Sequence, residues 1–454
     1  MSDASMPDTG PNAAPKAVKT SIHTLDDRTK KRNAAESRFK MYGIAAIATG
    51  LLMLIVLLTT IIGNGYSAFQ QTFVTLEVEL LESKLDKKGE RDIEKIKKVS
   101  TFGYAPLLKG AFEAKVEELG IETELKSKAM AGLLSKSAAK DLRNLVLEDI
   151  NQIGSTVEMT FLANSRVDGY LKGRVSRESI ANDKNISPEQ LDFVDQLVEA
   201  GVIKKKFNLN FIIGADASDQ RPEAAGIGVS MAGSFFMMLV VLGLALPIGV
   251  AASIYLEEFA PKNWLTDIIE VNISNLAAVP SIVFGILGLA VFINYMHLPQ
   301  SAPLVGGLVL TLMTLPTIII STRASLKAVP PSIRDAALGL GASKMQSVFH
   351  HVLPLAAPGI LTGTIIGLAQ ALGETAPLLL IGMIGFIASN APTGIAEGLL
   401  SPNSAMPAQI YEWAKRADPA FYERAWGGII ILLVFLVTMN TIAVILRRRF
   451  ERRW

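Results

Sequence analysis

One carboxylate lies deep within an otherwise apolar stretch of the sequence. Glu374 belongs to LAQALGETAPLLLIG, with Gly373 and Thr375 beside it and Pro377 shortly after it. A carboxylate surrounded by hydrocarbon is costly, so it is expected to face a bundle interior or a wet cavity. Glycine and proline break helices and free backbone groups that can line a pathway. We therefore predict a broken helix at a translocation pathway; the alternative is that Glu374 only ties a kinked helix to its neighbour.

Two arginines are candidate partners for an anion or for a carboxylate. Arg323 ends an apolar stretch, and Arg334 lies in the polar segment that follows. Guanidinium groups bind oxyanions and carboxylates through paired hydrogen bonds. Anchoring of a cytoplasmic helix end by the positive-inside preference explains Arg323 equally well.

The elements that must position these residues are membrane helices. Half of the 454 residues are hydrophobic and only 19% are charged, and more than half of the charges lie in residues 63–223. Each of six apolar stretches has about the 20 residues that a membrane-spanning helix needs. They are residues 41–62, 231–255, 275–295, 304–322, 359–387 and 425–446.

The predicted fold is an all-α membrane protein with a mixed α/β domain inserted after its first helix. Strand-like alternation at 75–80 and 207–213 and a capping box at Ser187–Gln190 indicate that mixed domain. Basic flanks at both ends and an even number of spans put both termini in the cytoplasm and the inserted domain outside. The predicted parts are a cytoplasmic tail 1–40, a first span 41–62, an extracytoplasmic domain 63–225, a five-helix core 226–446 with a cytoplasmic loop 323–358, and a basic end 447–454.

Composition excludes several kinds of site. The chain has no cysteine, and its four histidines show no metal-ligand spacing, so we expect no disulfide and no metal site. No G-x-x-x-x-G-K-[ST] phosphate loop occurs, so ATP and Mg²⁺ are expected on a partner, and the chain is expected to carry no catalytic residue or cofactor. The net charge of +2 gives no reason to expect nucleic-acid binding.

The cytoplasmic loop predicts two short helices joined by a sharp turn. Residues 332–340 and 344–353 read as helices, Gly341 permits the turn, and Pro354 is expected to stop the second helix. We call residues 332–353 the elbow. Such an elbow offers a partner protein a rigid surface; the alternative is an ordinary interhelical loop.

The elbow resembles the EAA coupling loop of importer-type ABC permeases, in spacing and in sequence. The departures are an aspartate for the first glutamate and His351 at an isoleucine position. The resemblance implies docking on a dimer of ATP-binding subunits. The matching positions, which it implies couple the chain to the ATPase, are Asp335, Ala336, Ala337, Gly341, Leu353 and Pro354.

A second resemblance concerns the cargo. The string from Gly373 to Leu379 is similar to the signature of the A-type permease of phosphate-specific ABC importers, and the likeness covers roughly residues 231–446. Compact members have a short outer loop where this chain has its inserted domain, so the chain resembles a subset with a large insertion. The family implies inorganic phosphate as cargo, a second related permease, an extracytoplasmic phosphate-binding protein and the bacterial inner membrane as its place.

Two other functions compete with phosphate import. The importer could carry another oxyanion or small solute, because the coupling loop is shared across cargoes. A sensor with an outer ligand domain would need a cytoplasmic signalling region after its second helix. Instead a short loop at 257–272 and four more spans follow.

Overall fold

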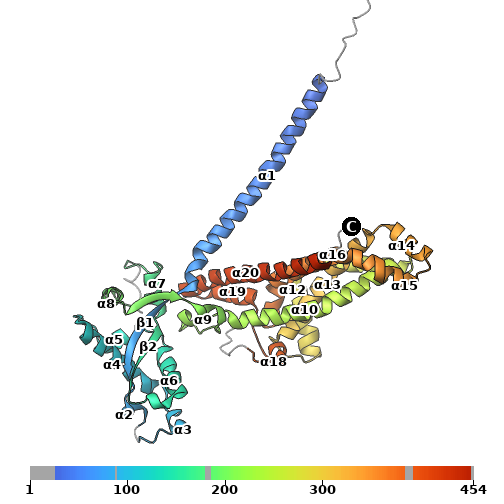
Figure 1. Cartoon of the computed structure of the whole chain (residues 1–454). Coiled ribbons are helices and arrows are strands. Elements are labelled where there is room, and N and C mark those ends of the chain that lie inside the picture. The colour runs from blue at the N-terminus through green and yellow to red at the C-terminus, as the bar shows by residue number, and fades with distance from the viewer. Residues whose placement is uncertain (1–25, 87–88, 179–185, 384–391, 451–454) are drawn as a thin grey trace, which may run out of the picture. The chain divides into compact units, whose positions relative to one another are not determined.

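The computed structural model describes residues 26–86, 89–178, 186–383 and 392–450. It divides into two compact units, residues 1–60 and 61–454, which are described separately (Figure 1). In the first unit, every residue from Asp27 onward belongs to helix α1 (Asp27–Gly65). The helix therefore takes in part of the segment predicted as a tail, whose residues 1–25 lie outside the described residues. Its apolar side chains are exposed all around, which is typical of a helix in lipid.

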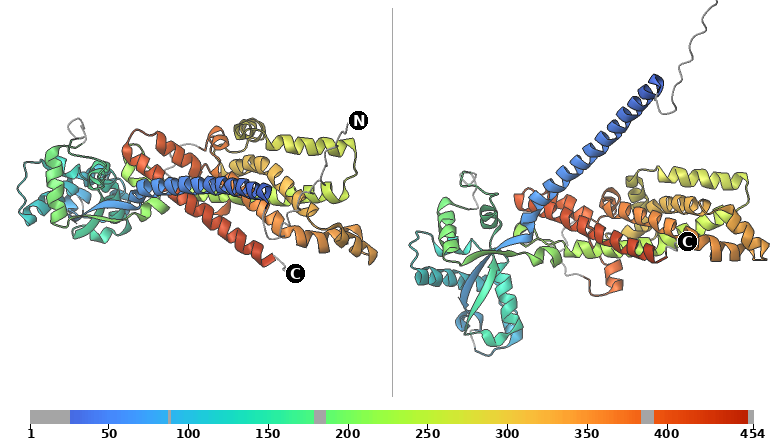
Figure 2. Two further views of the ribbon diagram at one scale, coloured as in Figure 1. Left: turned by 90° about the horizontal axis from the view of Figure 1, so that it is seen from above. Right: turned by 45° about the horizontal axis from the view of Figure 1, so that its top comes forward.

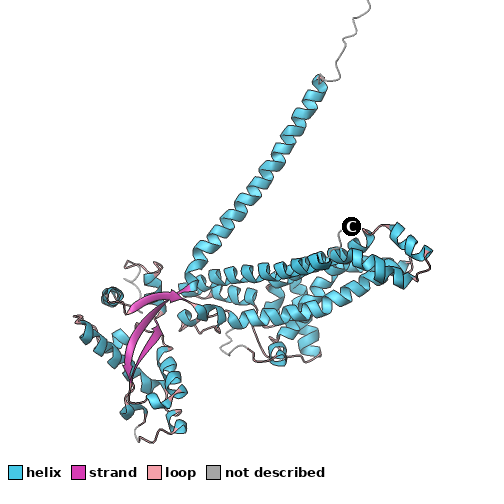
Figure 3. Ribbon diagram, viewed as in Figure 1, coloured by secondary structure: helices cyan, strands magenta, loops and turns pink. Residues whose placement is uncertain are grey.

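The inserted domain is built on a three-stranded antiparallel sheet, shown in magenta in Figure 3. The strand order is β2 (Thr156–Leu162), β1 (Gln70–Glu79), β3 (Ile203–Phe207). Alternate side chains of β1 are fully buried against α4 (Thr101–Leu119) and its neighbours, which makes one face of the sheet the domain core. The strand predicted at 75–80 and the mixed fold class are thereby confirmed.

The other predicted strand, at 207–213, is wrong. β3 ends at Phe207, and residues Leu209–Ile213 form the short helix α9. The Asn208 side chain accepts a hydrogen bond from the Phe211 backbone N–H at 3.1 Å, so it caps this helix. An asparagine can satisfy backbone donors in this way, and here that local bond overrides the alternating pattern.

The capping box predicted at Ser187 is confirmed. The Ser187 hydroxyl accepts from the Gln190 backbone N–H at 3.3 Å, and the Gln190 side chain accepts from the Ser187 backbone N–H at 2.9 Å. Helix α8 (Pro188–Glu199) follows, and after its C-cap Ala200 comes Gly201 with φ +74°. Two further helices, α6 (Ala138–Glu148) and α7 (Ser165–Leu171), complete the part of the domain used below.

The core contains long apolar helices. With α1, five helices are long and apolar enough to cross a membrane, and a bent pair would make a sixth, counted within the described residues. The core members are α10 (Gly228–Ile254), α13 (Pro303–Lys327), α16 (Leu353–Gly373) and α20 (Pro419–Phe450). In both views of Figure 2, α20 is the long red helix; it packs against α16 and α19 (Met406–Lys415).

The bent pair corrects the straight span predicted at 275–295. Helix α11 (Trp264–Ala277) meets α12 (Ser281–Leu287) and its π-helical continuation η6 (Gly288–Tyr295) at 103°. Pro280 lies at the bend, where it disfavours a helical residue before it and cannot donate a backbone hydrogen bond. α11 also occupies most of the segment expected as a loop at 257–272.

Glycines bring α16 close to α13. A Cβ at Gly359 or Gly363 would overlap the side chains of Ser325 and Ser321 on α13. The glycine spacing in α16 therefore serves helix packing inside the bundle, as small residues do in membranes.

Candidate functional site

The chain breaks its helix at Glu374. α16 ends at Gly373, Glu374 is extended at φ −74° and ψ 133°, and the short helix α17 (Ala376–Leu380) begins after Thr375. Thr375 offers its carbonyl to the backbone N–H groups of Leu378 and Leu379, both at 3.1 Å. The predicted break is confirmed, but residues 384–387 of the predicted span 359–387 lie outside the described residues.

The break packs against the other discontinuous segment of the core. A Cβ added to Gly285 of α12 would lie 2.7 Å from the Pro377 Cα and 2.9 Å from its carbonyl oxygen. Pro377 is buried, whereas Glu374 and Thr375 are partly exposed and Gly373 is exposed. Within the described residues, no hydrogen bond or ion pair reaches the Glu374 carboxylate. It therefore stands beside two broken helices with its oxygens available.

Arg323, near the C-terminal end of α13, and Arg334, in the elbow, are both bonded to glutamates. Neither arginine is bonded to Glu374. Arg323 donates to Glu270 at 2.5 Å and to Glu257 at 3.3 Å. Arg334 donates to the Glu258 carboxylate through Nε and a terminal nitrogen, at 3.1 and 2.6 Å. Both arginines thus act as counter-ions for carboxylates, though for acids other than Glu374.

The elbow has the two helices and the turn that the sequence predicts. α14 (Pro331–Gly339) is followed by Gly341 with φ +86°, a conformation that glycine adopts without strain. A second capping box, between Ser343 and Gln346, begins α15 (Lys344–Ser347).

The predicted stop at Pro354 is wrong. α15 continues through a π-helical turn, η7 (Val348–Val352), directly into α16. A proline has no N–H to donate and normally clashes with the carbonyl four residues earlier. In the wider π turn, the hydrogen bonds do not follow the α-helical i to i−4 pattern. Pro354 can therefore occupy the first turn of the α-helix α16 without this clash.

The elbow is fixed to the core on one side and exposed on the other. Arg334 also donates to the carbonyls of Leu326 and Val329, at 2.9 and 2.7 Å, which ties α14 to the end of α13. Ala337 is buried and Leu353 partly buried, while Leu340 and Met345 are 91% and 62% exposed. The exposed positions of the predicted coupling set are Asp335, Ala336, Gly341 and Pro354.

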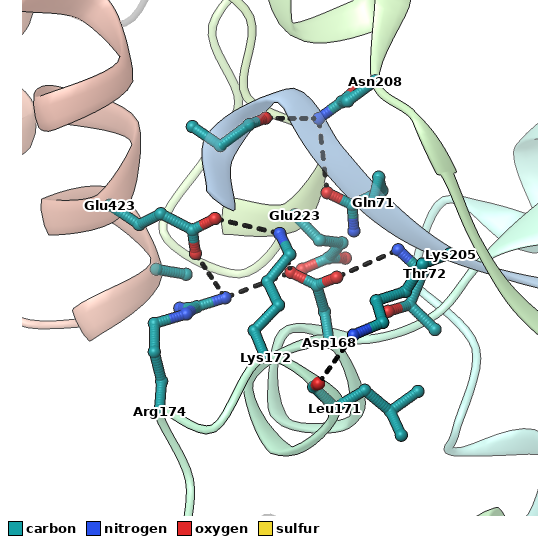
Figure 4. A network of polar contacts seen from close by, with 12 residues as sticks. Gln71, Thr72, Asp168, Leu171, Lys172, Arg174, Lys205, Asn208, Glu223 and Glu423 are labelled. Carbon is teal, nitrogen blue, oxygen red and sulfur yellow. Dashed lines mark hydrogen bonds and ion pairs between the residues drawn. The ribbon is translucent and has the colours of Figure 1, made fainter. Parts of the chain in front are cut away.

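Sequence reasoning missed a buried ion network that joins the inserted domain to α20 (Figure 4). The Lys172 ammonium lies 2.7 Å from Asp168 and 2.9 Å from Glu423, with all three side chains 3% exposed. Arg174 bonds the same two carboxylates, at 3.1 and 2.5 Å. The backbone N–H of Thr72 in β1 donates to Asp168 at 2.9 Å.

A second part of this network centres on Arg424, the residue after Glu423. Its guanidinium donates to the carbonyls of Ala68 and Glu223, at 2.8 and 3.0 Å, and to the Gln71 side chain. Burial raises the pKa of the Glu223 carboxyl above its ordinary value, and burial lowers the pKa of Lys172. The only signal in the sequence was a pair of charges at the start of the last apolar stretch. Their partners lie hundreds of residues away.

Among the described residues, no group of three or more potential ligands is arranged to hold a metal ion.

Comparison with known proteins assigns separate families to the two halves of the chain. Residues 26–181 match the model of a domain of unknown function, DUF3333. Residues 245–454 match the model described as "Binding-protein-dependent transport system inner membrane component". The chain is accordingly a multi-pass inner membrane protein of the ABC permease class.

Individual relatives are similar to about half of the chain. The phosphate transport system permease protein PstA of Yersinia pestis is 30% identical over 224 residues, which are 49% of this chain and 73% of that protein. PstA 1 of Mycobacterium tuberculosis (strain CDC 1551 / Oshkosh) is 29% identical over 230 residues, or 51% and 73%. A solved inward-facing structure of the MetNI methionine ABC transporter aligns at 16% identity with a TM-score of 0.37, over 50% of this chain and 95% of that chain. That score is low, so the family assignment depends on the sequence relatives.

The Yersinia protein is covered over 73% of its length. The elbow and the broken helix at Glu374 lie within residues 245–454, which match the transport-component family model. This chain belongs to the PstA family of phosphate transport system permease proteins.

Proposed function

We propose that this chain is the permease subunit of an ATP-driven importer that carries inorganic phosphate into the cytoplasm. The observation that carries the proposal is the similarity of this chain to phosphate permeases, one of which is 30% identical over 224 residues. The break at Glu374 and the elbow lie within residues 245–454, which match the transport-component family model, and supply the two parts that such a subunit needs, a pathway and a coupling surface.

In this proposal the elbow receives the energy of ATP hydrolysis. The exposed Leu340 and Met345 give an ATP-binding subunit an apolar surface, and Asp335 adds an exposed charge that no described residue pairs with. Arg334 fixes α14 to the core, so a push on the elbow is passed to α13 and α16 and is not absorbed locally. ATP and Mg²⁺ belong on that subunit, because this sequence has no phosphate loop. The chain itself is then a transport subunit and not an enzyme.

Glu374 is proposed to recognise the proton of the cargo. Near neutral pH phosphate still carries at least one proton, whereas sulfate carries none. An ionised carboxylate only accepts hydrogen bonds, so it can take one from phosphate and repels sulfate. Gly373, Thr375 and Pro377 place this carboxylate at a helix break, where backbone groups are free to line the pathway.

Arg323 and Arg334 are proposed to position the cytoplasmic side and not to bind cargo. Their guanidinium groups are occupied by Glu257, Glu270 and Glu258. The positive-inside preference places this side, and both chain termini, in the cytoplasm. A second related permease, a dimer of ATP-binding subunits and an extracytoplasmic phosphate-binding protein complete the proposed complex, with lipid around the apolar helices.

Reconstitution of the complex in liposomes tests this function. ATP-dependent uptake of labelled phosphate is measured against labelled sulfate and molybdate at equal concentration. Phosphate is expected to enter at least tenfold faster than either competitor. Faster uptake of sulfate or molybdate would overturn the cargo assignment, and uptake that needs no ATP would overturn the importer class.

A further inference from the structure

A cavity of about 660 Å³ opens in the inserted domain, separate from the helix break and the elbow. Its walls come from the start of α4, from the loop before α6, from the first turn of α6 and from the segment that leads to the core. The lining residues lie outside residues 245–454, which match the transport-component family model, and none of the roles proposed above involves them.

The cavity is lined by basic residues without acidic ones. Lys109, Lys136, Lys140 and Arg221 face it, and no aspartate or glutamate is among the described residues that line it. Lys136 and Lys140 are exposed, and Lys109 and Arg221 are half-buried. Within the part of the chain that the structure describes, none of the four side chains makes an ion pair or a side-chain hydrogen bond. Four cations therefore converge on one concave surface with their hydrogen-bond donors unused.

This arrangement is not a general property of the domain surface. A smaller cavity of about 240 Å³, also bordered by α4, is lined by Glu77, Glu79 and Glu118 with Lys115 as its one cation. There Lys115 is paired with Glu118 at 2.8 Å. A charged surface usually mixes signs in this way, so a concave surface of one sign attracts ligands of the other sign.

Acids lie close to the basic cavity, but none of the described ones lines it. Asp141 feels the charges of Lys140 and Arg221, but its carboxylate is held by the Ser137 hydroxyl at 2.8 Å, and it is not a lining residue. Glu223 accepts a hydrogen bond from the lining Ser135, and burial raises the pKa of its carboxyl, which disfavours the charged form. Asp219, between two lining residues, is paired with Arg416 at 3.5 Å. The hydroxyls of Thr101, Ser135 and Ser218 also line the cavity and add neutral donors, which suit oxyanion oxygens.

We propose that this cavity of the inserted domain binds a phosphate-type oxyanion, either free orthophosphate or the phosphate groups of a larger anion. Lysine and arginine are the side chains that bind phosphate oxygens through charge-assisted hydrogen bonds. The volume lies within the range of small-molecule sites and exceeds what one orthophosphate fills, so the cavity has room for a hydrated ion or a short polyphosphate. This site is distinct from the transport pathway and its existence does not depend on the proposed cargo.

The cavity is connected to the last membrane helix by hydrogen bonds. Ser135 lines the cavity and donates to the buried Glu223 carboxyl. The Glu223 carbonyl accepts from Arg424 of α20 at 3.0 Å. An anion that draws the Ser135 hydroxyl toward itself would weaken the hydrogen bond between Ser135 and Glu223, and Glu223 is itself bonded to α20.

A single-site fluorescence experiment tests the proposal on the full chain in nanodiscs. The chain has no cysteine, so F102C gives a unique labelling position on a cavity residue that is 86% exposed. An environment-sensitive dye is attached, and orthophosphate is titrated at constant ionic strength, because charge attraction is screened by salt. A saturable change that equal concentrations of chloride do not produce is expected.

A charge-matched pair of variants decides whether the cavity is responsible. K136Q/K140Q/R221Q in the labelled chain is expected to raise the dissociation constant at least tenfold, since the loss of one charge-assisted bond alone is worth roughly that factor. K98Q/K126Q/K128Q removes three exposed lysines of the same domain outside the cavity and is expected to change it less than twofold.

The outcomes separate the alternatives. Absence of a saturable response, or an equal loss in both triple variants, would overturn the proposal. A parallel titration with tripolyphosphate identifies the source of the phosphate groups: tighter binding than orthophosphate points to a larger anion, and equal or weaker binding points to free orthophosphate. The readout is binding at the inserted domain, so a failure here leaves the transport experiment unaffected, and the reverse also holds.

Discussion

Replacement of Arg334 by methionine is expected to uncouple the elbow from the core. The arginine bonds Glu258, which is 8% exposed, and two carbonyls at the end of α13. Removal of one partner from a buried ion pair costs about 3–5 kcal/mol, because the other charge is left without a partner. Arg334 is 22% exposed, so we take the lower figure, about 3 kcal/mol. At about 1.4 kcal/mol for each factor of ten, the correctly placed elbow becomes roughly a hundredfold less populated relative to displaced ones.

The assay is the affinity of the reconstituted permease for its ATP-binding subunit, together with ATP-dependent uptake. Arg334→Met is expected to weaken that affinity by up to a hundredfold and to lower uptake in parallel. The double variant Arg334→Met/Glu258→Leu should recover part of the loss, because it removes the stranded carboxylate and fills the space with apolar atoms.

Lys327→Met is the matched control for this experiment. Lys327 is 59% exposed and pairs with Glu257 at 3.6 Å, so its loss should cost no more than about 1 kcal/mol. Wild-type affinity and uptake in Arg334→Met would refute the reasoning. So would a double variant no better than the single one, because the penalty would then not come from Glu258.

Three further predictions follow from the other buried or isolated charges. Glu374→Gln is expected to lower phosphate uptake at least tenfold with the complex still assembled, because the amide offers donors where the carboxylate only accepts; uptake at the wild-type rate would contradict the pathway role. Burial raises the pKa of Glu223 above 4.5, so its favourable contribution is complete below pH 4.5 and is lost as the pH rises through the folded-state value. Glu223→Gln should therefore remove part of the fall in unfolding free energy above pH 4.5, and identical pH slopes in both proteins would count against this. Lys172→Met removes one of the two cations that bond Asp168 and Glu423 and leaves Arg174 as the other, so it should lower the unfolding free energy by about 3 kcal/mol, the low end for a broken buried ion pair, measured by denaturant titration in detergent; an unchanged midpoint would disprove the burial argument.

Local signals in the sequence predicted local structure well. The capping box at Ser187, the turn at Gly341 and the break at Glu374 each depend on a few neighbouring residues, and each is present in the structure. The apolar stretches predicted membrane helices because crossing a bilayer requires length and composition, which a window of about 20 residues contains.

Prolines show where local reasoning stops. Pro280 bends its segment by 103°, whereas Pro354 lies in a continuous helix. Each proline follows an apolar residue in an apolar region. The rule that a proline interrupts a helix therefore predicted neither the sharp bend at Pro280 nor the continuous helix at Pro354. The difference lies in the backbone before each proline, since only Pro354 follows a π-helical turn that removes the usual clash.

The ion network could not be predicted, because its members are brought together only by the complete fold. Asp168 and Lys172 are on the inserted domain and Glu423 is on α20, with the rest of the core between them in sequence. A charge in the first turn of a predicted membrane helix reads as an exposed, solvated group. The structure instead buries it, and its burial is tolerated because cations and carboxylates of the network are paired with one another.

This network determines what the inserted domain can do to the core. Pulling the domain away from α20 would strand charges on both sides at a cost of several kcal/mol, so the two are expected to move together. β1 follows the first membrane helix in sequence after the short 3-10 helix Tyr66–Phe69, and the same strand binds Asp168 and, through Gln71, Arg424. An anion bound in the basic cavity therefore acts on a domain that cannot shift without moving α20. If anion binding in the cavity favours one position of α20, that position must raise the anion affinity of the cavity by the same factor, because coupling between two sites is reciprocal.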